Sequence, residues 1–150
     1  MKIKLSVSKE RYQEIKMSLI AHGIELDENS DLVLSENNRY LDNLVVKDTE
    51  TNERICLSTN EIISIESYGH AIEVHTQDKI YQSTERLYQI VRQLDPSEFL
   101  RISNSVIIAI DKIKTINPTL SMKFILTLTN GRRVDVTRSY YYIFKDYFNI

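Results

Sequence analysis

The fold is decided by the stretch from Phe99 to Arg138, which reads FLRISNSVIIAIDKIKTINPTLSMKFILTLTNGRRVDVTR. Within it, Val106 to Ile110 is an apolar run that is too short for a globular helix and is rich in β-branched residues. Such a run predicts a strand that is buried on both faces. We therefore expect this strand to lie in the middle of a sheet.

A β-hairpin is expected further along the same stretch. Apolar residues alternate with other residues on both sides of the turn-forming pair Asn130-Gly131, namely Phe124, Leu126, Leu128, Val134 and Val136. A two-residue turn would place Val134 on the face of Thr127. A three-residue loop from Thr129 to Gly131, with Gly131 at positive φ, pairs Leu126 with Val134 and gathers all five apolar residues on one face. We favour this second register.

The rest of the chain is predicted to be mainly β, with a small α/β appendage in front. Alternation and turn signals predict further strands at Ile3–Val7, Ile24–Leu26, Asp31–Leu34, Leu44–Val46, Arg54–Leu57, Ile62–Glu66, Ala71–His75 and Lys79–Gln82. The series of strands after Leu44, with its short connections, is typical of an antiparallel β domain. Because Ser35 to Asn38 is polar and turn-prone, we expect an appendage over residues 1–43 and a main domain over residues 44–150.

Three short helices are expected. Apolar residues have helical spacing in three places, at Tyr12, Ile15 and Leu19, at Leu87, Ile90, Val91 and Leu94, and at Tyr140, Ile143, Phe144, Tyr147 and Phe148. Ser8 is placed to cap the first helix and Gly23 to end it. Ser83 or Thr84 is placed to cap the second helix, which ends before Pro96.

Cys56 and His75 are predicted to have ordinary structural or surface roles. The single cysteine, Cys56, excludes an internal disulfide, and its place between Ile55 and Leu57 predicts a buried structural thiol. His75 shares the polar face of its strand with Glu73, so we expect it to be exposed to solvent.

Catalysis has no recognisable machinery in this sequence. The three histidines are scattered, and with only three glycines there is no glycine-rich phosphate loop. No apolar run approaches the length of a membrane span, and the N-terminus lacks the apolar core of a signal peptide. We expect a cytoplasmic protein that is not an enzyme and has no cofactor or metal.

Charge is divided unevenly along the chain. Leu100 to Ile150 contains eight basic and three acidic residues, a net charge of +5, whereas the preceding residues have a net charge of −7. Attraction to phosphate is a property of one face of a protein rather than of the whole chain. The total charge of −2 is therefore compatible with DNA binding.

The same stretch resembles the LytTR family of bacterial transcription regulators. The family pattern runs F-x-R-x-H-x-S, a hydrophobic strand with V-N, a hydrophobic residue with K-I, then L-x-x-G and finally a hydrophobic residue with S-R. The matching residues here are Phe99, Arg101, Ser105, Lys112, Ile113, Leu128, Gly131, Val136 and Arg138. Upstream, EIISIE from Glu61 to Glu66 resembles the family's D-I-x-x-I-E segment. The resemblance covers about Leu44 to Phe148, with departures where the family has His, Asn and Ser, at Ser103, Ala109 and Thr137.

The resemblance implies an elongated arrangement of antiparallel sheets with a minor helix and a short C-terminal helix. In such proteins loops, rather than a recognition helix, enter the major groove of DNA. The usual operators are paired direct repeats, which implies a homodimer or two copies side by side on DNA. Most relatives also have a receiver domain, for which the first 43 residues are too few, so we expect a stand-alone form that is not regulated by aspartyl phosphorylation.

Three residues are expected to contact DNA bases: Asn104, Arg138 and His70. The amide of Asn104, in a loop, offers a donor and an acceptor side by side, which matches N6 and N7 of adenine. Arg138 stands at the family's terminal arginine, where a guanidinium could meet guanine O6 and N7 or a phosphate. His70 lies in a loop where the family places a DNA-contacting residue, and an ordinary turn role is an equal alternative.

Six basic residues are expected to contact the DNA backbone: Arg101, Lys112, Lys114, Lys123, Arg132 and Arg133. They would meet phosphates if they share a face, and would form a solvated rim if they do not. Arg132 and Arg133 point in opposite directions along a strand, so at most one of them faces a given surface. Arg101 could equally pair with an acid and fix the geometry of its loop.

We therefore expect a sequence-specific transcription regulator that binds double-stranded DNA. The alternative is a non-enzymatic protein-interaction or ligand-sensing β domain that does not touch DNA. The acidic appendage would be repelled by DNA, so we expect it to face away and to serve dimerisation or a partner.

Overall fold

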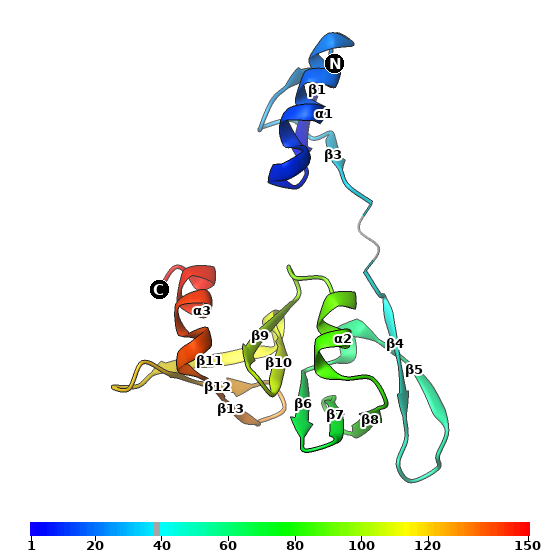
Figure 1. Cartoon of the computed structure of the whole chain (residues 1–150), viewed down its shortest axis with the longest axis vertical. Coiled ribbons are helices and arrows are strands. Elements are labelled where there is room, and N and C mark those ends of the chain that lie inside the picture. Colours follow the sequence, from blue (N-terminus) through cyan, green and yellow to red (C-terminus); the bar gives the residue numbers. More distant parts are fainter. Residues whose placement is uncertain (38–39) are drawn as a thin grey trace. The chain divides into compact units, whose positions relative to one another are not determined.

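The computed structural model describes residues 1–37 and 40–150. The chain forms two compact units, residues 1–39 and 40–150, and each is considered by itself (Figure 1). Asn38, at the end of the turn-prone stretch where we expect the linker, lies outside the described residues.

The first unit is a small α/β structure. It consists of β1 (Lys2–Ser6), α1 (Lys9–Ala21), β2 (Glu25–Leu26) and β3 (Val33–Ser35), and its parallel sheet has the order β2-β1-β3. Gly23, at a φ of 77°, follows α1 as predicted. Ile3 and Leu5 of β1 are buried, but α1 has no buried residue. The unit therefore has a very small core.

The second unit contains two antiparallel sheets (Figure 1). The larger sheet has the order β5-β4-β8-β7-β6-β10-β9, and its strands are β4 (Asn43–Lys47), β5 (Arg54–Ser58), β6 (Ser64–Tyr68), β7 (Ala71–His75), β8 (Ile80–Ser83), β9 (Phe99–Ser103) and β10 (Val106–Ala109). The smaller sheet has the order β11-β12-β13, with β11 (Ile113–Pro118), β12 (Phe124–Leu128) and β13 (Arg133–Val136). The mainly β fold that the sequence predicts is confirmed.

Helices cover the two sheets. The helical elements are α2 (Leu87–Gln93), α3 (Tyr141–Phe148) and the short 3₁₀ turns η1 (Thr59–Glu61), η2 (Ile110–Lys112) and η3 (Arg138–Tyr140). Leu87 and Ile90 of α2 pack into a first core cluster with residues of β4, β6, β7 and β10. Phe144 of α3 packs into a second cluster with residues of β12 and β13. Figure 1 shows α2 and α3 on these separate parts of the unit.

Strand β10 is buried on both faces, as its sequence predicts. Ile107 belongs to the first core cluster, and the next residue, Ile108, belongs to the second. The strand has neighbours on both sides, β6 and β9, but it is next to the edge of the sheet rather than at its centre.

The hairpin has the predicted register. Leu126 is opposite Val134, and Phe124 is opposite Val136. Gly131, at a φ of 84°, ends the three-residue loop, and the five apolar residues of the two strands are buried together. A residue with a side chain would be strained in this conformation.

Strand β11 has no counterpart in the prediction. Its residues Lys114, Thr115 and Asn117 are exposed, and the strand ends in Pro118. Among the described strands it pairs only with β12, so it is an edge strand, and an edge position tolerates a proline and polar side chains. Apolar periodicity is too weak in such a strand to reveal it.

Both helices of the second unit differ in detail from the prediction. α2 begins at Leu87, because Ser83 Oγ accepts the N–H of Glu85 over 3.1 Å and closes a turn before the helix. In α3, Ile143 and Tyr147 are 56% and 46% exposed, although their spacing predicts burial. The side of α3 that packs against the second core cluster is instead formed by Tyr141, Phe144 and Phe148.

The prediction of a buried Cys56 is wrong, because this thiol is exposed. Cys56 lies on the edge strand β5 opposite Val45, which is 60% exposed. The neighbouring pair, Leu44 and Leu57, is buried. Core residues cover only one face of these two strands, and alternation places the cysteine on the other.

Candidate nucleic-acid interface

The turn between β9 and β10 presents Asn104. Asn104 and Ser105 form this turn, and both are exposed. The guanidinium of Arg101 stabilises the turn through two hydrogen bonds. Nε donates to the carbonyl of Ser103 over 3.1 Å, and Nη2 donates to that of Asn104 over 2.7 Å. Arg101 thus has backbone carbonyls as partners rather than an acid, and they fix the geometry of the loop.

The segment after β13 lies beside this turn. The backbone N–H of Thr137 donates to the carbonyl of Ile102 over 3.1 Å. Three residues later, the hydroxyl of Tyr140 donates to Oδ1 of Asn104 over 3.2 Å. The fold therefore brings Arg138, which stands between Thr137 and Tyr140, to the same end of the domain as Asn104. Sequence reasoning missed Tyr140, because its helical spacing indicated a core residue.

Arg138 is exposed and keeps most of its hydrogen-bonding capacity. Its Nε donates to the carbonyl of Ser121, in the β11–β12 loop, over 3.2 Å. Within residues 1–37 and 40–150, neither Nη group has a hydrogen-bond partner. The bond through Nε orients the guanidinium, and the two terminal nitrogens are left to bind a ligand.

The third candidate, His70, is exposed in the turn between β6 and β7. Strands β6 and β10 are antiparallel neighbours with Val106 opposite Glu66, so the β6–β7 turn lies at the same sheet end as Asn104. The backbone N–H of Ser67 also donates to the carbonyl of Ser105 over 2.8 Å. We call the β6–β7 turn, the β9–β10 turn and the segment at Arg138 the candidate loops.

The predicted backbone contacts are distributed over two ends of the smaller sheet. Lys123 follows Ser121, the partner of Arg138, by two residues. Lys112 lies in η2, which is at the other end of β10 from Asn104. Lys114 and Arg133 are exposed on β11 and β13, near the β12–β13 turn. The structure thus brings Lys123, but not Lys112, close to the candidate loops.

Arg132 has a partner inside the protein. Its Nε donates to Oε2 of Glu66 over 2.5 Å, and its Nη2 donates to Oε1 over 2.6 Å and also contacts the hydroxyl of Tyr68. The side chain of Glu66 is only 3% exposed. This two-pronged pair joins the larger sheet to the β12–β13 turn.

Glu66 is the buried centre of a polar cluster. Ser64 Oγ and Tyr68 OH each donate to its carboxylate over 2.8 Å. Nε2 of His75 lies 3.4 Å from Glu66 and 3.0 Å from Glu73. The prediction that His75 is exposed is therefore wrong, because the smaller sheet covers this face of β6 and β7. We call Ser64, Glu66, Tyr68, His75 and Arg132 the Glu66 cluster.

The charge of Glu66 is stabilised despite its burial. Burial away from solvent raises the pKa of this carboxyl. Hydrogen bonds from Arg132, Ser64 and Tyr68 lower the pKa, and together they outweigh the effect of burial. The net result is a pKa below the ordinary value, so Glu66 is ionised at neutral pH. Burial and the neighbouring Glu66 carboxylate raise the pKa of Tyr68, which remains a hydrogen-bond donor.

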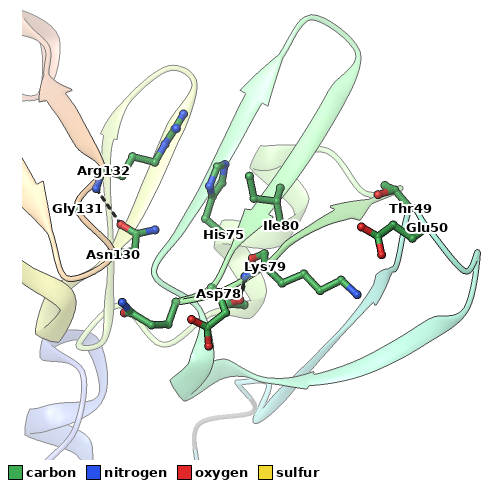
Figure 2. A pocket seen from close by; sticks show the side chains of 11 residues that line it. Thr49, Glu50, His75, Asp78, Lys79, Ile80, Asn130, Gly131 and Arg132 are labelled. Carbon is green, nitrogen blue, oxygen red and sulfur yellow. Dashed lines mark hydrogen bonds between the residues drawn. The ribbon is translucent and has the colours of Figure 1, made fainter.

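An open hollow of about 660 Å³ lies beside this cluster. Figure 2 shows Asn130 and Arg132 on one side of it and Asp78 and Lys79 on the other. Both cationic side chains are already paired, Lys79 with Asp48 and Arg132 with Glu66. This pairing makes the hollow a poor site for an anion.

Neither a metal site nor a membrane-spanning helix is found among residues 1–37 and 40–150. No group of three or more His, Cys, Asp or Glu side chains is placed to hold a metal ion. No helix has both the length and the apolar character needed to cross a bilayer.

The second unit is a β-rich domain with exposed polar side chains on loops at one end. Such an arrangement is suited to binding an extended polar ligand. The family model described as the LytTr DNA-binding domain matches residues 52–149. The chain belongs to this family.

Similar proteins include curated bacterial regulators. Transcriptional regulatory protein LytR of Staphylococcus aureus (strain N315) is 33% identical over 89 residues, which are 59% of this chain and 36% of that protein. Sensory transduction protein LytT of Bacillus subtilis (strain 168) is 25% identical over 112 residues, 75% of this chain and 46% of that protein. The chain thus spans less than half the length of these relatives.

A solved structure has the same fold. It is a LytTr DNA-binding domain from Bacillus cereus, of a protein described as a methyl-accepting/DNA response regulator. The TM-score is 0.69 at 23% identity, over 73% of this chain and 99% of that one.

Proposed function

We propose that this protein is a sequence-specific DNA-binding transcription regulator whose candidate loops read the major groove. The observation that carries the proposal is the gathering of His70, Asn104 and Arg138, all exposed, on neighbouring loops of a LytTr DNA-binding domain. The regulators that share this domain, LytR and LytT, support the role in transcription.

The chemistry of these side chains fits base edges. The free Nη groups of Arg138 can donate to O6 and N7 of guanine, or to a phosphate. His70 can donate or accept through its ring nitrogens. Loops held by a rigid sheet suit this task, because they present side chains without costly ordering on binding.

Phosphate contacts would add affinity without sequence preference. The net charge of +5 over residues 100–150 supports such contacts. Lys123 is the first candidate because it lies near Arg138, and its side chain has no hydrogen bond or ion pair with another described residue. Arg132 is a weaker candidate, because a phosphate would have to compete with Glu66 for its guanidinium.

Two copies of the protein are proposed to act together on paired direct repeats, with the first unit as the dimerisation or partner surface. Of its described apolar residues only Ile3 and Leu5 are buried, and units of about 40 residues rarely bury enough apolar surface to be stable alone. Met17 and Val33 are 65% and 57% exposed, which leaves apolar surface for a second copy. The acidic residues Glu25, Asp27, Glu28, Asp31 and Glu36 support an orientation away from DNA.

Deletion of residues 1–39 tests this role. We expect the remaining unit to fold and to keep its affinity for a single site, and the oligomeric state to change. Circular dichroism would establish folding, and light scattering would give the mass. A folded truncated protein with no affinity for DNA would contradict the assignment.

The main test is electrophoretic retardation of DNA from upstream of the protein's own gene, followed by footprinting. We expect retardation that weakens steeply with salt, with a slope of log K against log[salt] of about −0.9 for each neutralised phosphate. Absence of retardation, or a flat salt response, would favour an interaction domain that does not touch DNA.

A further inference from the structure

The side chain of Asn104 is held in one orientation by Tyr140. A carboxamide has one oxygen that accepts hydrogen bonds and one NH₂ group that donates two. The oxygen, Oδ1, accepts the Tyr140 hydroxyl over 3.2 Å. The NH₂ group has no hydrogen-bond partner in the part of the chain that the structure describes, and the residue is exposed. Asn104 therefore presents a donor to an incoming ligand.

Tyr140 is itself well supported. Its ring is half-buried and packs against the second core cluster. Its backbone N–H donates to the carbonyl of Thr137 over 3.0 Å, within the turn that contains Arg138. A tyrosine has few rotatable bonds, so little conformational entropy is lost when it holds a partner. The hydroxyl is thus a fixed group against which the amide of Asn104 can align.

The backbone of the turn is fixed as well. Arg101 binds the carbonyls of Ser103 and Asn104, and the N–H of Ser105 donates to Ser103 Oγ over 3.2 Å. Arg101 and Ser103 hold the main chain, so rotation of the side-chain amide is the freedom that remains. Tyr140 removes that freedom.

We infer that Tyr140 is a positioning residue that fixes the amide of Asn104 so that its NH₂ group is presented to base edges. This inference rests on the proposed function and makes it more specific. In the major groove, guanine offers N7 and O6 as acceptors, adenine offers N7, and thymine offers O4, whereas cytosine offers only the N4 donor. An NH₂ group held toward the base edges therefore favours the first three bases and disfavours cytosine as the base that it contacts. Tyr140 uses one of the two lone pairs of Oδ1, so its bond fixes the orientation of the amide and leaves the other lone pair free.

The experiment begins with the full chain and a randomised duplex library, from which bound duplexes are selected. Every single-base variant of the selected site is then titrated with the wild type and with Asn104→Ala, Tyr140→Phe and the double variant. Tyr140→Phe removes only the hydroxyl. Tyr147→Phe is the matched control, because it removes a hydroxyl from the same C-terminal region that donates to Ser97 rather than to Asn104.

We expect the wild type to reject cytosine at one position and Asn104→Ala to lose that discrimination. Tyr140→Phe should weaken binding of the selected site by roughly 2- to 10-fold, the value of one hydrogen bond. Its loss of discrimination should be confined to the position that Asn104→Ala affects, and the double variant should match Asn104→Ala. Tyr147→Phe should match the wild type throughout.

Several outcomes would overturn the inference. One is that Tyr140→Phe binds every single-base variant of the site with the affinity of the wild type. Another is that Tyr140→Phe loses the same factor in affinity at all positions, which indicates a merely structural role. A position contacted by Asn104 that prefers cytosine, or an Asn104→Ala panel with unchanged base preferences, would also overturn it while the proposed function stands. If no specific duplex is selected at all, the proposed function fails and the inference fails with it.

Discussion

The candidate loops and the Glu66 cluster both place an arginine beside polar groups, but the two regions leave it in different states. At the loops, Arg138 is exposed, and a single backbone carbonyl orients it through Nε. In the cluster, two nitrogens of Arg132 bind a carboxylate whose side chain is 3% exposed. Arg138 can give its remaining donors to a ligand at little cost. Arg132 could do so only by leaving a buried charge without its partner.

The role of a basic residue near the end of a strand depends on what faces it. Arg132 and Arg138 flank the same strand, β13, and both belong to the positively charged part of the sequence. Their roles separate because an acid from another sheet faces one of them and solvent faces the other.

Arg132→Met should destabilise the protein most. Removal of one partner from a buried ion pair costs about 3–5 kcal/mol, and we expect about 3 kcal/mol because the Arg132 side chain is 34% exposed. Urea unfolding followed by circular dichroism measures the change. The neighbouring Arg133→Met is the control and should stay within about 0.5 kcal/mol of the wild type, because Arg133 is exposed. Equal stability of the two variants would mean that the Glu66 cluster does not hold the sheets together.

Arg138→Ala should have the opposite profile. We expect a loss of about 1–3 kcal/mol in binding to the specific site and a much smaller loss on random DNA. The free energy of unfolding should change by less than about 0.5 kcal/mol, because the side chain is exposed. Fluorescence anisotropy with both duplexes measures the binding. Equal losses on the two duplexes would make Arg138 a backbone contact and direct the search for base readers to His70.

Acid should reduce the difference between the wild type and Arg132→Met. The pKa of Glu66 in the folded protein lies below its ordinary value, so the folded state binds this proton less tightly than the unfolded state. The stabilisation is therefore fully present above the ordinary glutamate pKa of about 4.3 and is lost as the pH falls through the lower folded value. His75, Glu73 and Tyr68 also face Glu66, so the comparison of the two proteins, rather than either alone, isolates the contribution of Arg132. A constant difference in unfolding free energy from pH 7 to the acid limit would contradict this account.

Lysine substitutions should give the smallest effects. Lys123→Ala should weaken specific and random DNA by similar factors and reduce the salt slope by about one unit, because Lys123 lies near Arg138. Lys112→Ala should do less, since Lys112 is at the far end of β10 from Asn104. Titrations at several salt concentrations would compare them. A larger slope change for Lys112 would indicate that DNA extends along the whole domain rather than over the candidate loops.

Local patterns predicted the parts of the fold that depend on neighbouring residues. The run of β-branched residues in β10 indicated burial on both faces, and Asn130-Gly131 with its alternating flanks indicated the hairpin and its register. In both cases the pattern and the final environment agree, because core residues cover both faces of β10 and the one apolar face of the hairpin. Turn signals between predicted strands also indicated the exposed positions of His70 and Asn104.

The remaining features depend on contacts that are distant in the sequence. Glu66 and Arg132 are 66 residues apart, and alternation in β6 gives no sign that a second sheet covers the polar face. The second sheet also buries His75, which alternation predicts to be exposed to solvent. Cys56 is the opposite case, since a strand at the edge of a sheet can leave one face uncovered. Helical spacing correctly indicates that the ring of Tyr140 packs against the core, but it says nothing about the hydroxyl at the end of that ring.

Strand β10 couples the unfolding of the two sheets of the second unit. Ile107 packs into one core cluster and Ile108 into the other, so a single strand forms a wall of both. Loss of either cluster exposes one face of β10 and removes support from the other cluster. We therefore expect the two sheets to melt in one cooperative transition, and the amide hydrogens of β10 to exchange with solvent only through global opening of the unit.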